Sequence, residues 1–219
     1  MNTELSINLP KLNIQEVSII LVGDTPLIVH AWAKKAKEEM LAKQMKKAKS
    51  AKEAKDPFRD YCESLYWVDG MPANPTVKDI DKARFGIPAV GLKNAAVTAC
   101  TSTGNITKVA ARQAFHVVAA TGPFVLIEGS KPRMREDMVR VGMGTADIRY
   151  RAEFHPWWCN VNVAFNANVL SAEQIVNLFN TAGFGVGIFE WRPERDGENG
   201  RFHVATGAEQ ASLTKRRAA

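Results

Sequence analysis

Close to its C-terminal end the chain reads Ala182-Gly-Phe-Gly-Val-Gly-Ile-Phe-Glu-Trp-Arg-Pro-Glu-Arg-Asp-Gly-Glu-Asn-Gly-Arg-Phe-His-Val204, a stretch with five glycines, three arginines and one tryptophan. Glycine allows a backbone to pass close to a ligand or to another chain. Arginine binds phosphate, and a tryptophan ring offers a surface on which a base can stack. This composition indicates a contact with nucleic acid. The structural alternative is a helix end followed by a bulge and turns.

The residues around this stretch predict a helix before it and short strands within and after it. Ser171 and Gln174 have the spacing of a capping box, which marks the start of a helix. Four apolar residues would turn one face of that helix toward the core: Ile175, Val176, Leu178 and Phe179. Gly183 fits its C-terminal end. We expect strand segments at 187–191 and 201–204.

Apolar and alternating runs predict the other elements. Residues 17–22 are apolar and β-branched, which indicates a buried central strand. Residues 147–154 alternate, so Arg149 and Arg151 share a face that we expect to meet solvent or a ligand. Trp157 and Trp158 follow on opposite faces, one for the core and one for stacking or subunit contact. Further strands are expected at 27–29, 124–127 and 161–165, and helices at 86–100 and 106–119.

This order of elements is compatible with an α+β fold of the ferredoxin-like or RRM-like type, β-α-β-β-α-β. We expect a single domain over residues 1–205 that begins with an irregular arm over 1–12. A lysine-rich helical insertion would occupy about 31–86, and a hairpin or thumb-like excursion about 128–147. That hairpin would carry Arg133, Arg135 and Arg140, either toward a ligand or simply into solvent. Residues 206–219 read as a polar basic tail.

The charge of the chain is concentrated in one segment. The formal net charge is +6, and residues 34–55 alone hold nine lysines against three glutamates. Alanine and methionine fill most of the rest of this segment, which favours a helix. It is either a solvated helix or an arm that contacts phosphates. The candidate phosphate contacts in it are Lys34, Lys35, Lys43, Lys46 and Lys47.

The sequence does not contain the residue patterns that are typical of several classes of site. The three cysteines are far apart in sequence and form no CxxC pair, which predicts buried thiols in a reducing compartment and argues against a structural zinc site. Residues 183–187 follow a helix rather than a strand, so a dinucleotide loop is not expected. We expect no cofactor and no metal. No secretory signal or long apolar run is evident, which predicts a cytoplasmic protein without a membrane partner.

In three places the chain resembles the RAMP superfamily, the RNA-binding proteins of CRISPR effector complexes, and especially their backbone subunits. The first place is the opening strand ending in Gly23-Asp-Thr-Pro-Leu-Ile28. The second is Ile87-Pro-Ala-Val-Gly-Leu-Lys93, and the third is the glycine-rich loop ending in Gly200-Arg-Phe202. The likeness covers about three-quarters of the chain through short motifs. The chain is also similar to RAMP-like proteins that occur in bacteriophage genomes.

The resemblance implies binding to single-stranded nucleic acid by a protein that forms a filament or a CRISPR-like multisubunit complex. It places the first-helix lysine region and the glycine-rich loop against the strand. The residues matched in this way are Lys93, Gly185, Gly187, Arg192, Arg195 and Arg201. Trp191 is a further candidate for stacking, or alternatively a core anchor. The chain departs from the RNA-cleaving branches because it has no clear catalytic or metal-binding cluster.

Three functions follow as hypotheses. The leading one is a non-catalytic, sequence-tolerant protein that binds single-stranded RNA or DNA and self-associates along it. The second is a metal-independent endoribonuclease of the RAMP type, with His30 or His155 as the acid or base. The third is a phage-type interaction protein that imitates a backbone subunit and caps its assembly.

Overall fold

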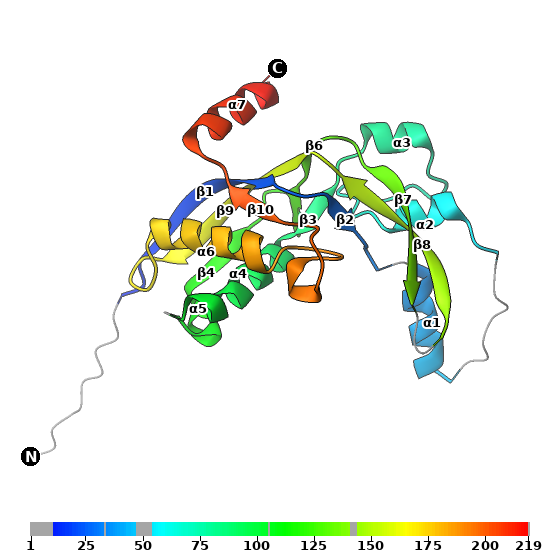
Figure 1. Ribbon diagram of the computed structural model, residues 1–219, viewed down its shortest axis with the longest axis horizontal. Coiled ribbons are helices and arrows are strands. Elements are labelled where there is room, and N and C mark those ends of the chain that lie inside the picture. Colours follow the sequence, from blue (N-terminus) through cyan, green and yellow to red (C-terminus); the bar gives the residue numbers. More distant parts are fainter. Residues whose placement is uncertain (1–10, 33, 47–53, 105, 141–143, 219) are drawn as a thin grey trace, which may run out of the picture.

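A computed structural model describes residues 11–32, 34–46, 54–104, 106–140 and 144–218; for 34–36 and 216–218 it describes the backbone alone (Figure 1). Within these residues, antiparallel sheets pack with seven α-helices. The α+β class that the sequence predicts is therefore confirmed. The arm expected over 1–12 lies outside the described residues except for its last two, which have no regular structure.

The largest sheet has four successive strands, all antiparallel to their neighbours. In spatial order they are β10 (Phe202–Val204), β1 (Ile14–Gly23), β9 (Trp157–Asn166) and β4 (Phe115–Val118), and β6 (Glu128–Gly129) pairs with the start of β9. Along β1, Ile19 and Leu21 are buried whereas Ser18 is exposed. The strand over 17–22 is thus buried on one face only, not on both as expected, because helices cover one side of the sheet.

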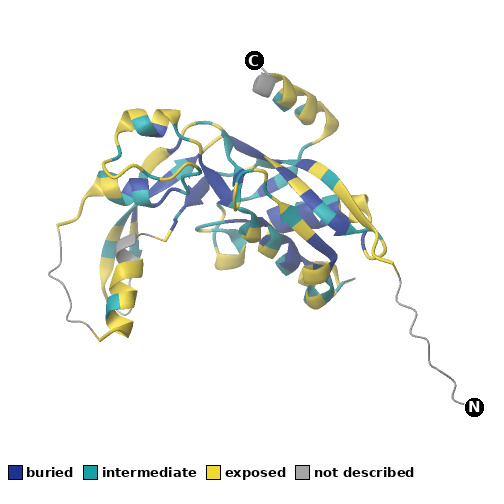
Figure 2. Cartoon of the chain, turned by 180° about the vertical axis from the view of Figure 1, so that it is seen from behind, coloured by how far each residue is buried: buried dark blue, intermediate teal, exposed yellow. Residues whose placement is uncertain are grey.

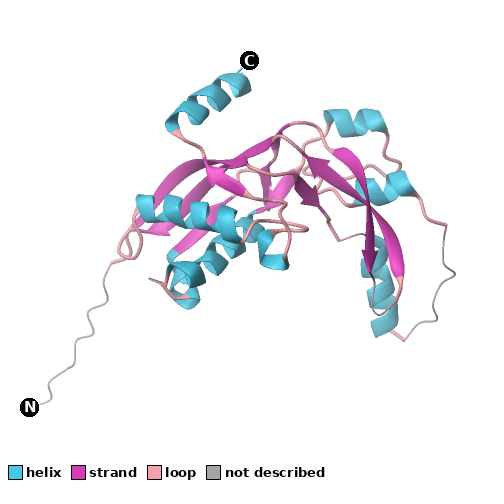
Figure 3. Cartoon of the chain, in the orientation of Figure 1, coloured by secondary structure: helices cyan, strands magenta, loops and turns pink. Residues whose placement is uncertain are grey.

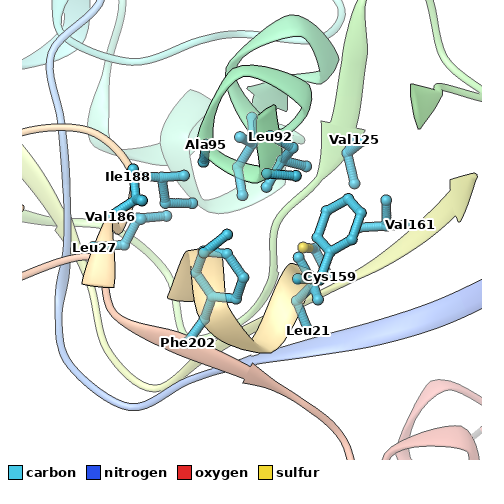
Figure 4. Packing of buried hydrophobic residues seen from close by; sticks show 14 of the residues in the cluster. Leu21, Leu27, Leu92, Ala95, Val125, Cys159, Val161, Val186, Ile188 and Phe202 are labelled. Atoms are coloured by element: carbon cyan, nitrogen blue, oxygen red, sulfur yellow. The ribbon is translucent and has the colours of Figure 1, made fainter. Parts of the chain in front are cut away.

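Three helices cover that side: α4 (Ala89–Thr103), α5 (Lys108–Ala114) and α6 (Ala172–Gly185) (Figure 3). The capping box of Ser171 and Gln174 is present at the start of α6. Helices and sheet share one hydrophobic core: Leu92 of α4 and Phe202 of β10 belong to the same buried cluster as the sheet residues Cys159 and Val161 (Figure 4). The opposite face of this sheet carries none of these three helices. We call it the outer face of the main sheet.

A second group of elements stands beside the main sheet (Figure 1). Its sheet has the order β2 (Leu27–Val29), β8 (Ala146–Phe154) and β7 (Arg133–Arg140), and β7 and β8 form a long hairpin. The helices of this group are α1 (Lys34–Gln44), α2 (Pro57–Glu63) and α3 (Val77–Lys82), and a short pair, β3 (Gly86–Pro88) with β5 (Phe124–Leu126), lies between the groups. Since β8 leads into β9, one polypeptide path connects both sheets.

Some expected elements differ from the structure. Residues 106–119 contain α5 and then β4, rather than one helix. The polar basic tail expected over 206–219 contains the helix α7 (Gly207–Ala218). The short helix α3, for which no separate helix was predicted within the insertion of about 31–86, begins at the capping box of Thr76 and Asp79. Figure 2 shows α1 and α7 exposed along most of their length.

Two expectations about packing are also wrong. Gly183 does not end α6, which continues to Gly185; a Cβ on Gly183 would lie 1.8 Å from the carbonyl oxygen of Phe202. This glycine therefore lets α6 cross β10 at close range. Trp157 and Trp158 are both buried, so neither is free for stacking. Trp157 donates its indole N–H to the carbonyl of Thr25 at 2.8 Å.

Candidate nucleic-acid interface

The glycine-rich loop after α6 is fixed to β2 and to the turn before it. The backbone N–H of Glu190 donates to the carbonyl of Ile28, and that of Gly200 donates to the carbonyl of Pro26. Within the loop, the N–H of Ile188 donates to the carbonyl of Gly200, so the loop closes on itself. The strand expected over 187–191 is absent, because these N–H groups bond across the loop and to β2 rather than along a sheet.

This loop also holds an unusual backbone. Phe189, Trp191 and Asp196 have φ values of 64°, 58° and 57°, in the left-handed region that side chains other than glycine rarely adopt. Each such residue costs about 1 kcal/mol or more and persists only where the surroundings fix it. Gly187 has φ 67°, which glycine adopts freely. The loop is thus a rigid, strained platform that presents Trp191 to the surface.

Glu190 is the point where three segments meet. Its Oε1 lies 3.4 Å from His30 Nδ1, just after β2, and its Oε2 lies 3.6 Å from Arg151 Nη2 on β8. The contact with His30 holds the pKa of Glu190 below its ordinary value; burial opposes this, and Arg151 adds to the lowering. The carboxylate is therefore ionised at neutral pH and ties the loop to both neighbours.

The network continues along the hairpin. Arg151 is buried and lies 3.4 Å from Asp137, which Arg135 also contacts at 2.6 Å. Arg135 and Arg133 both bond Glu153, at 3.0 and 2.8 Å. Alternation placed Arg151 on a solvent or ligand face, and that is wrong for this residue, because Asp137 and Glu190 cover it. Arg149 on the same strand is partly exposed, 3.6 Å from Asp147.

A cavity of about 390 Å³ opens between the start of α4 and the loop. Its aromatic wall is the stacked pair of Tyr66 and Phe189, with ring centroids 5.7 Å apart. Glu190, Arg192 and Glu194 are the charged residues along it, so carboxylates outnumber cations. The cavity thus suits an uncharged planar group better than a phosphate.

The predicted loop residues are placed in different ways. Arg192 bonds Glu194 at 2.7 and 3.0 Å and donates to the carbonyl of Phe189, so its charge is already compensated. Arg195 is exposed on the short 3-10 turn. Arg201 bonds Glu198, and its guanidinium lies 5.6 Å from the ring centroid of Phe184. Gly185 faces open space, and Trp191 is partly exposed.

The lysine-rich segment forms α1, which stands away from the core. None of the described residues of α1 belongs to the buried core, and the helix has no extensive contact with another described element. The side chains of Lys37, Lys43 and Lys46 are exposed, whereas Lys47 lies outside the described residues and Lys34 and Lys35 are placed only by their backbone. The structure thus presents lysines beside the hairpin rather than against the core (Figure 1).

Lys93, a predicted nucleic-acid-binding residue, lies apart from the predicted residues of the glycine-rich loop. Its Nζ donates to the carbonyl of Arg112 at 2.9 Å and lies 3.1 Å from His116 Nδ1, on the side of α4 that faces α5 and β4. Burial lowers the pKa of this ammonium. Lys93 therefore does not line the cavity, although Ile87, Pro88, Val90 and Gly91 just before it do.

Two exposed aromatic residues were missed by sequence reasoning. Trp32 is 60% exposed and lies two residues before α1, and Phe184 is 74% exposed on the last turn of α6. Both stand next to predicted cationic or glycine-rich segments. The available signal for Trp32 was its place two residues before Lys34 and Lys35, and the signal for Phe184 was its place between Gly183 and Gly185.

The histidine, cysteine and acidic side chains are the candidates for a metal site or for acid–base and nucleophilic chemistry. Among the described residues, no group of three or more His, Cys, Asp and Glu side chains has the arrangement of a metal site. Burial raises the pKa of Cys159 to about 12 and that of Cys62 to about 11, so these thiols are poor nucleophiles at neutral pH. His155 is exposed at the corner between β8 and β9.

A scan against protein-family models and a search of curated proteins both find no match for the chain. Within the described ranges, no helix combines the length and the apolar composition that crossing a membrane requires.

Proposed function

We propose that this chain is a RAMP-like protein that binds single-stranded RNA or DNA without cleaving it and self-associates along the strand. The observation that carries the proposal is the convergence at Glu190. There the glycine-rich loop meets two other segments of the chain: the hairpin, through Arg151, and His30, which lies four residues before the lysine-rich segment. Because they are far apart in sequence, their meeting supports one shared surface.

The proposal extends to the fold. We assign the core to the ferredoxin-like type, β-α-β-β-α-β, formed by β1, α4, β4, β9, α6 and β10. The antiparallel strand order β10-β1-β9-β4 and the position of α4 and α6 on one side of the sheet support this assignment. The lysine-rich insertion and the hairpin then form a second lobe beside that core.

The charge distribution supports contact with a polyanion. Residues 34–55 carry +6, from nine lysines and three glutamates, which equals the net charge of the whole chain. Lysines on a helix without a packed face are free to follow a phosphate backbone, while Trp32 and Trp191 offer rings for bases. The cavity beside the loop has room for a single base or sugar.

The test is the salt dependence of binding. Labelled oligo(U) and oligo(dT) are titrated with the protein between 50 and 300 mM NaCl, and fluorescence anisotropy gives the affinity. Each phosphate contact on a single strand contributes about −0.7 to the slope of log K against log salt. A variant with Lys37, Lys43 and Lys46 changed to Gln should make the slope shallower by about 2, if all three contact phosphates.

The matched control removes the same charge elsewhere. Changing Lys78, Lys82 and Lys108 to Gln takes two exposed lysines from α3 and one partly exposed lysine from α5, and it should leave the slope nearly unchanged. Equal losses in the two variants would reduce the effect to net charge. The absence of binding to any oligonucleotide, together with copurification of other proteins, would point instead to the interaction protein that caps an assembly.

Self-association has its own readout. Size-exclusion chromatography with light scattering should show a small species alone and a species whose mass grows with oligonucleotide length. A single protomer on every length of strand would contradict the filament while leaving nucleic-acid binding intact.

A metal-independent endoribonuclease is the second candidate, and His30 is the observation that favours it. A carboxylate 3.4 Å from its Nδ1 is the arrangement that orients an imidazole for proton transfer, and Arg151 lies beside that carboxylate. Cleavage of labelled RNA in EDTA that disappears in His30→Gln and persists in His155→Gln would establish this activity. Intact RNA after long incubation with the wild-type protein would refute it.

A further inference from the structure

The C-terminal helix α7 lies on the opposite side of the main sheet from α4, α5 and α6 (Figure 1). His203 on β10 connects the helix to the sheet. Its Nδ1 lies 2.6 Å from Asp24 Oδ1, in the turn after β1, and its Nε2 lies 3.2 Å from Glu209 Oε1 on the first turn of α7. One imidazole thus bridges carboxylates from two separate elements.

Glu209 also fixes where α7 begins. Its carboxylate accepts hydrogen bonds from the backbone N–H and the hydroxyl of Thr206, both at 2.8 Å, and the Thr206 hydroxyl lies 3.5 Å from the N–H of Glu209. The His203 contact is therefore made to the base of the helix, where a small rotation would displace the far end by the greatest distance.

Beyond this base α7 is loosely seated. A hollow of about 170 Å³ separates it from the strands, with Ser18, Ile20, Trp158 and Asn160 on the sheet side and Gln210 and Thr214 on the helix side. No described residue of α7 belongs to the hydrophobic core, and α7 has no extensive contact with another described element. Trp158 lines this hollow together with Gln210 and Thr214 of α7 and is only 9% exposed.

We propose that α7 is a releasable cover of the outer face of the main sheet, and that the His203 bridge to Asp24 and Glu209 holds it in place. When the bridge opens, α7 swings off the sheet and uncovers a strip formed by Trp158, Ile20 and Asn160. The sheet side of the hollow is lined by Ser18, Ile20, Trp158 and Asn160, none of which is charged.

The bridge depends on the proton of His203. The charged groups facing the ring are Asp24 from the turn after β1 and Glu209 from α7; Arg201, just before β10, is paired with Glu198. Burial lowers the pKa of His203, but the hydrogen bonds to Asp24 and Glu209 outweigh it and hold the pKa above the ordinary value. Neutral imidazole has one N–H, so it cannot donate to both carboxylates.

The raised pKa of His203 decides the direction in which release of α7 depends on pH. The bridge is complete below the pKa that His203 has in the released state, where Asp24 still lies beside it, and weakens as pH rises through the higher pKa of the closed state. Within that interval the equilibrium constant for release rises about tenfold per pH unit. At the acid end, Glu209 keeps its charge below its ordinary pKa, because the Thr206 groups and His203 bond it.

Amide hydrogen exchange of the full-length protein between pH 5.5 and 8.5, corrected for the intrinsic rate, tests the proposal. A detached helix of this length is marginal in water. Protection of 207–215 should therefore fall, by up to about tenfold per pH unit, as pH rises through the interval between these two pKa values, while β1 and β9 stay protected. Tryptophan emission should shift to the red over the same range, and Trp158→Phe should abolish that shift.

Two variants separate the bridge from other titrations. His203→Gln should leave α7 poorly protected at every pH, whereas His155→Gln, at an exposed position, should keep the wild-type profile. Protection of α7 that is independent of pH in the wild type would overturn the proposal. So would unchanged protection in His203→Gln, or a loss that spreads equally through β1 and β9. None of these readouts involves nucleic acid, so they stand apart from the binding tests.

Discussion

Arg151 and Asp137 form a buried ion pair across the hairpin, with Arg151 Nη1 3.4 Å from Asp137 Oδ2. Both side chains are nearly inaccessible, and Arg151 Nε has no hydrogen-bond partner among the described residues. A buried pair of this kind is sensitive to the loss of one member, because the charge that remains has no compensation. Here Asp137 would keep Arg135, at 2.6 Å.

We expect Arg151→Met to lower the free energy of unfolding by about 3 kcal/mol, since the variant leaves Asp137 and Glu190 short of one cation. Arg149→Met, two residues away on the same strand and partly exposed, should change it by less than about 0.5 kcal/mol. Urea denaturation followed by circular dichroism measures both. Similar values for the two variants would show that the buried network contributes little.

The contrast between Arg149 and Arg151 shows which features the sequence predicts and which depend on tertiary contacts. Alternation over 147–154 correctly predicts a strand and puts Arg149 and Arg151 on one face. It contains no information on what covers that face at each position. Glu190 comes from a loop about forty residues later and covers Arg151 alone, so the burial of Arg151 is decided by a long-range contact.

Gly183 and Gly185 form a natural pair of variants on α6. A Cβ at Gly183 would meet the Phe202 carbonyl at 1.8 Å, so Gly183→Ala must push β10 away and should cost about 2 kcal/mol or more. A Cβ at Gly185 has nothing within 4 Å, so Gly185→Ala should be neutral or stabilising by up to about 1 kcal/mol. Thermal unfolding compares them; equal midpoints would contradict the close crossing of α6 and β10.

The glycine-rich stretch was only partly predictable for a related reason. Its composition indicates close backbone approaches, and the structure has them, but within the chain: Gly183 against β10, and Gly200 with its N–H on Pro26. Which glycines serve packing and which face solvent depends on the path of the loop over β2. Trp32 and Phe184 were missed because the exposure of an aromatic side chain is likewise set by tertiary packing.

Glu190 should make the loop sensitive to acid. Its pKa is held below the ordinary value, mainly by His30, so its contribution to stability is present above the unfolded value of about 4.5 and is lost as pH falls through the folded value. The melting temperature of Glu190→Gln should therefore lie below that of the wild type at pH 7 and converge with it toward pH 3.5. Glu173→Gln, on the first turn of α6, serves as the control. A constant difference across this range would argue against the lowered pKa.

Trp32 gives the sharpest separation of binding from folding. Its ring is 60% exposed beside the lysine-rich arm, so Trp32→Ala removes little buried surface and should leave the unfolding free energy within about 0.5 kcal/mol of the wild type. If the ring stacks on a base, affinity for oligo(U) should fall by about 1–3 kcal/mol, a five-fold to more than hundred-fold change in Kd. Val109→Ala, an equally exposed apolar residue on α5, should change neither quantity. Unaltered affinity in Trp32→Ala at low salt would exclude stacking at this position, and the strand would then be held through the lysines alone.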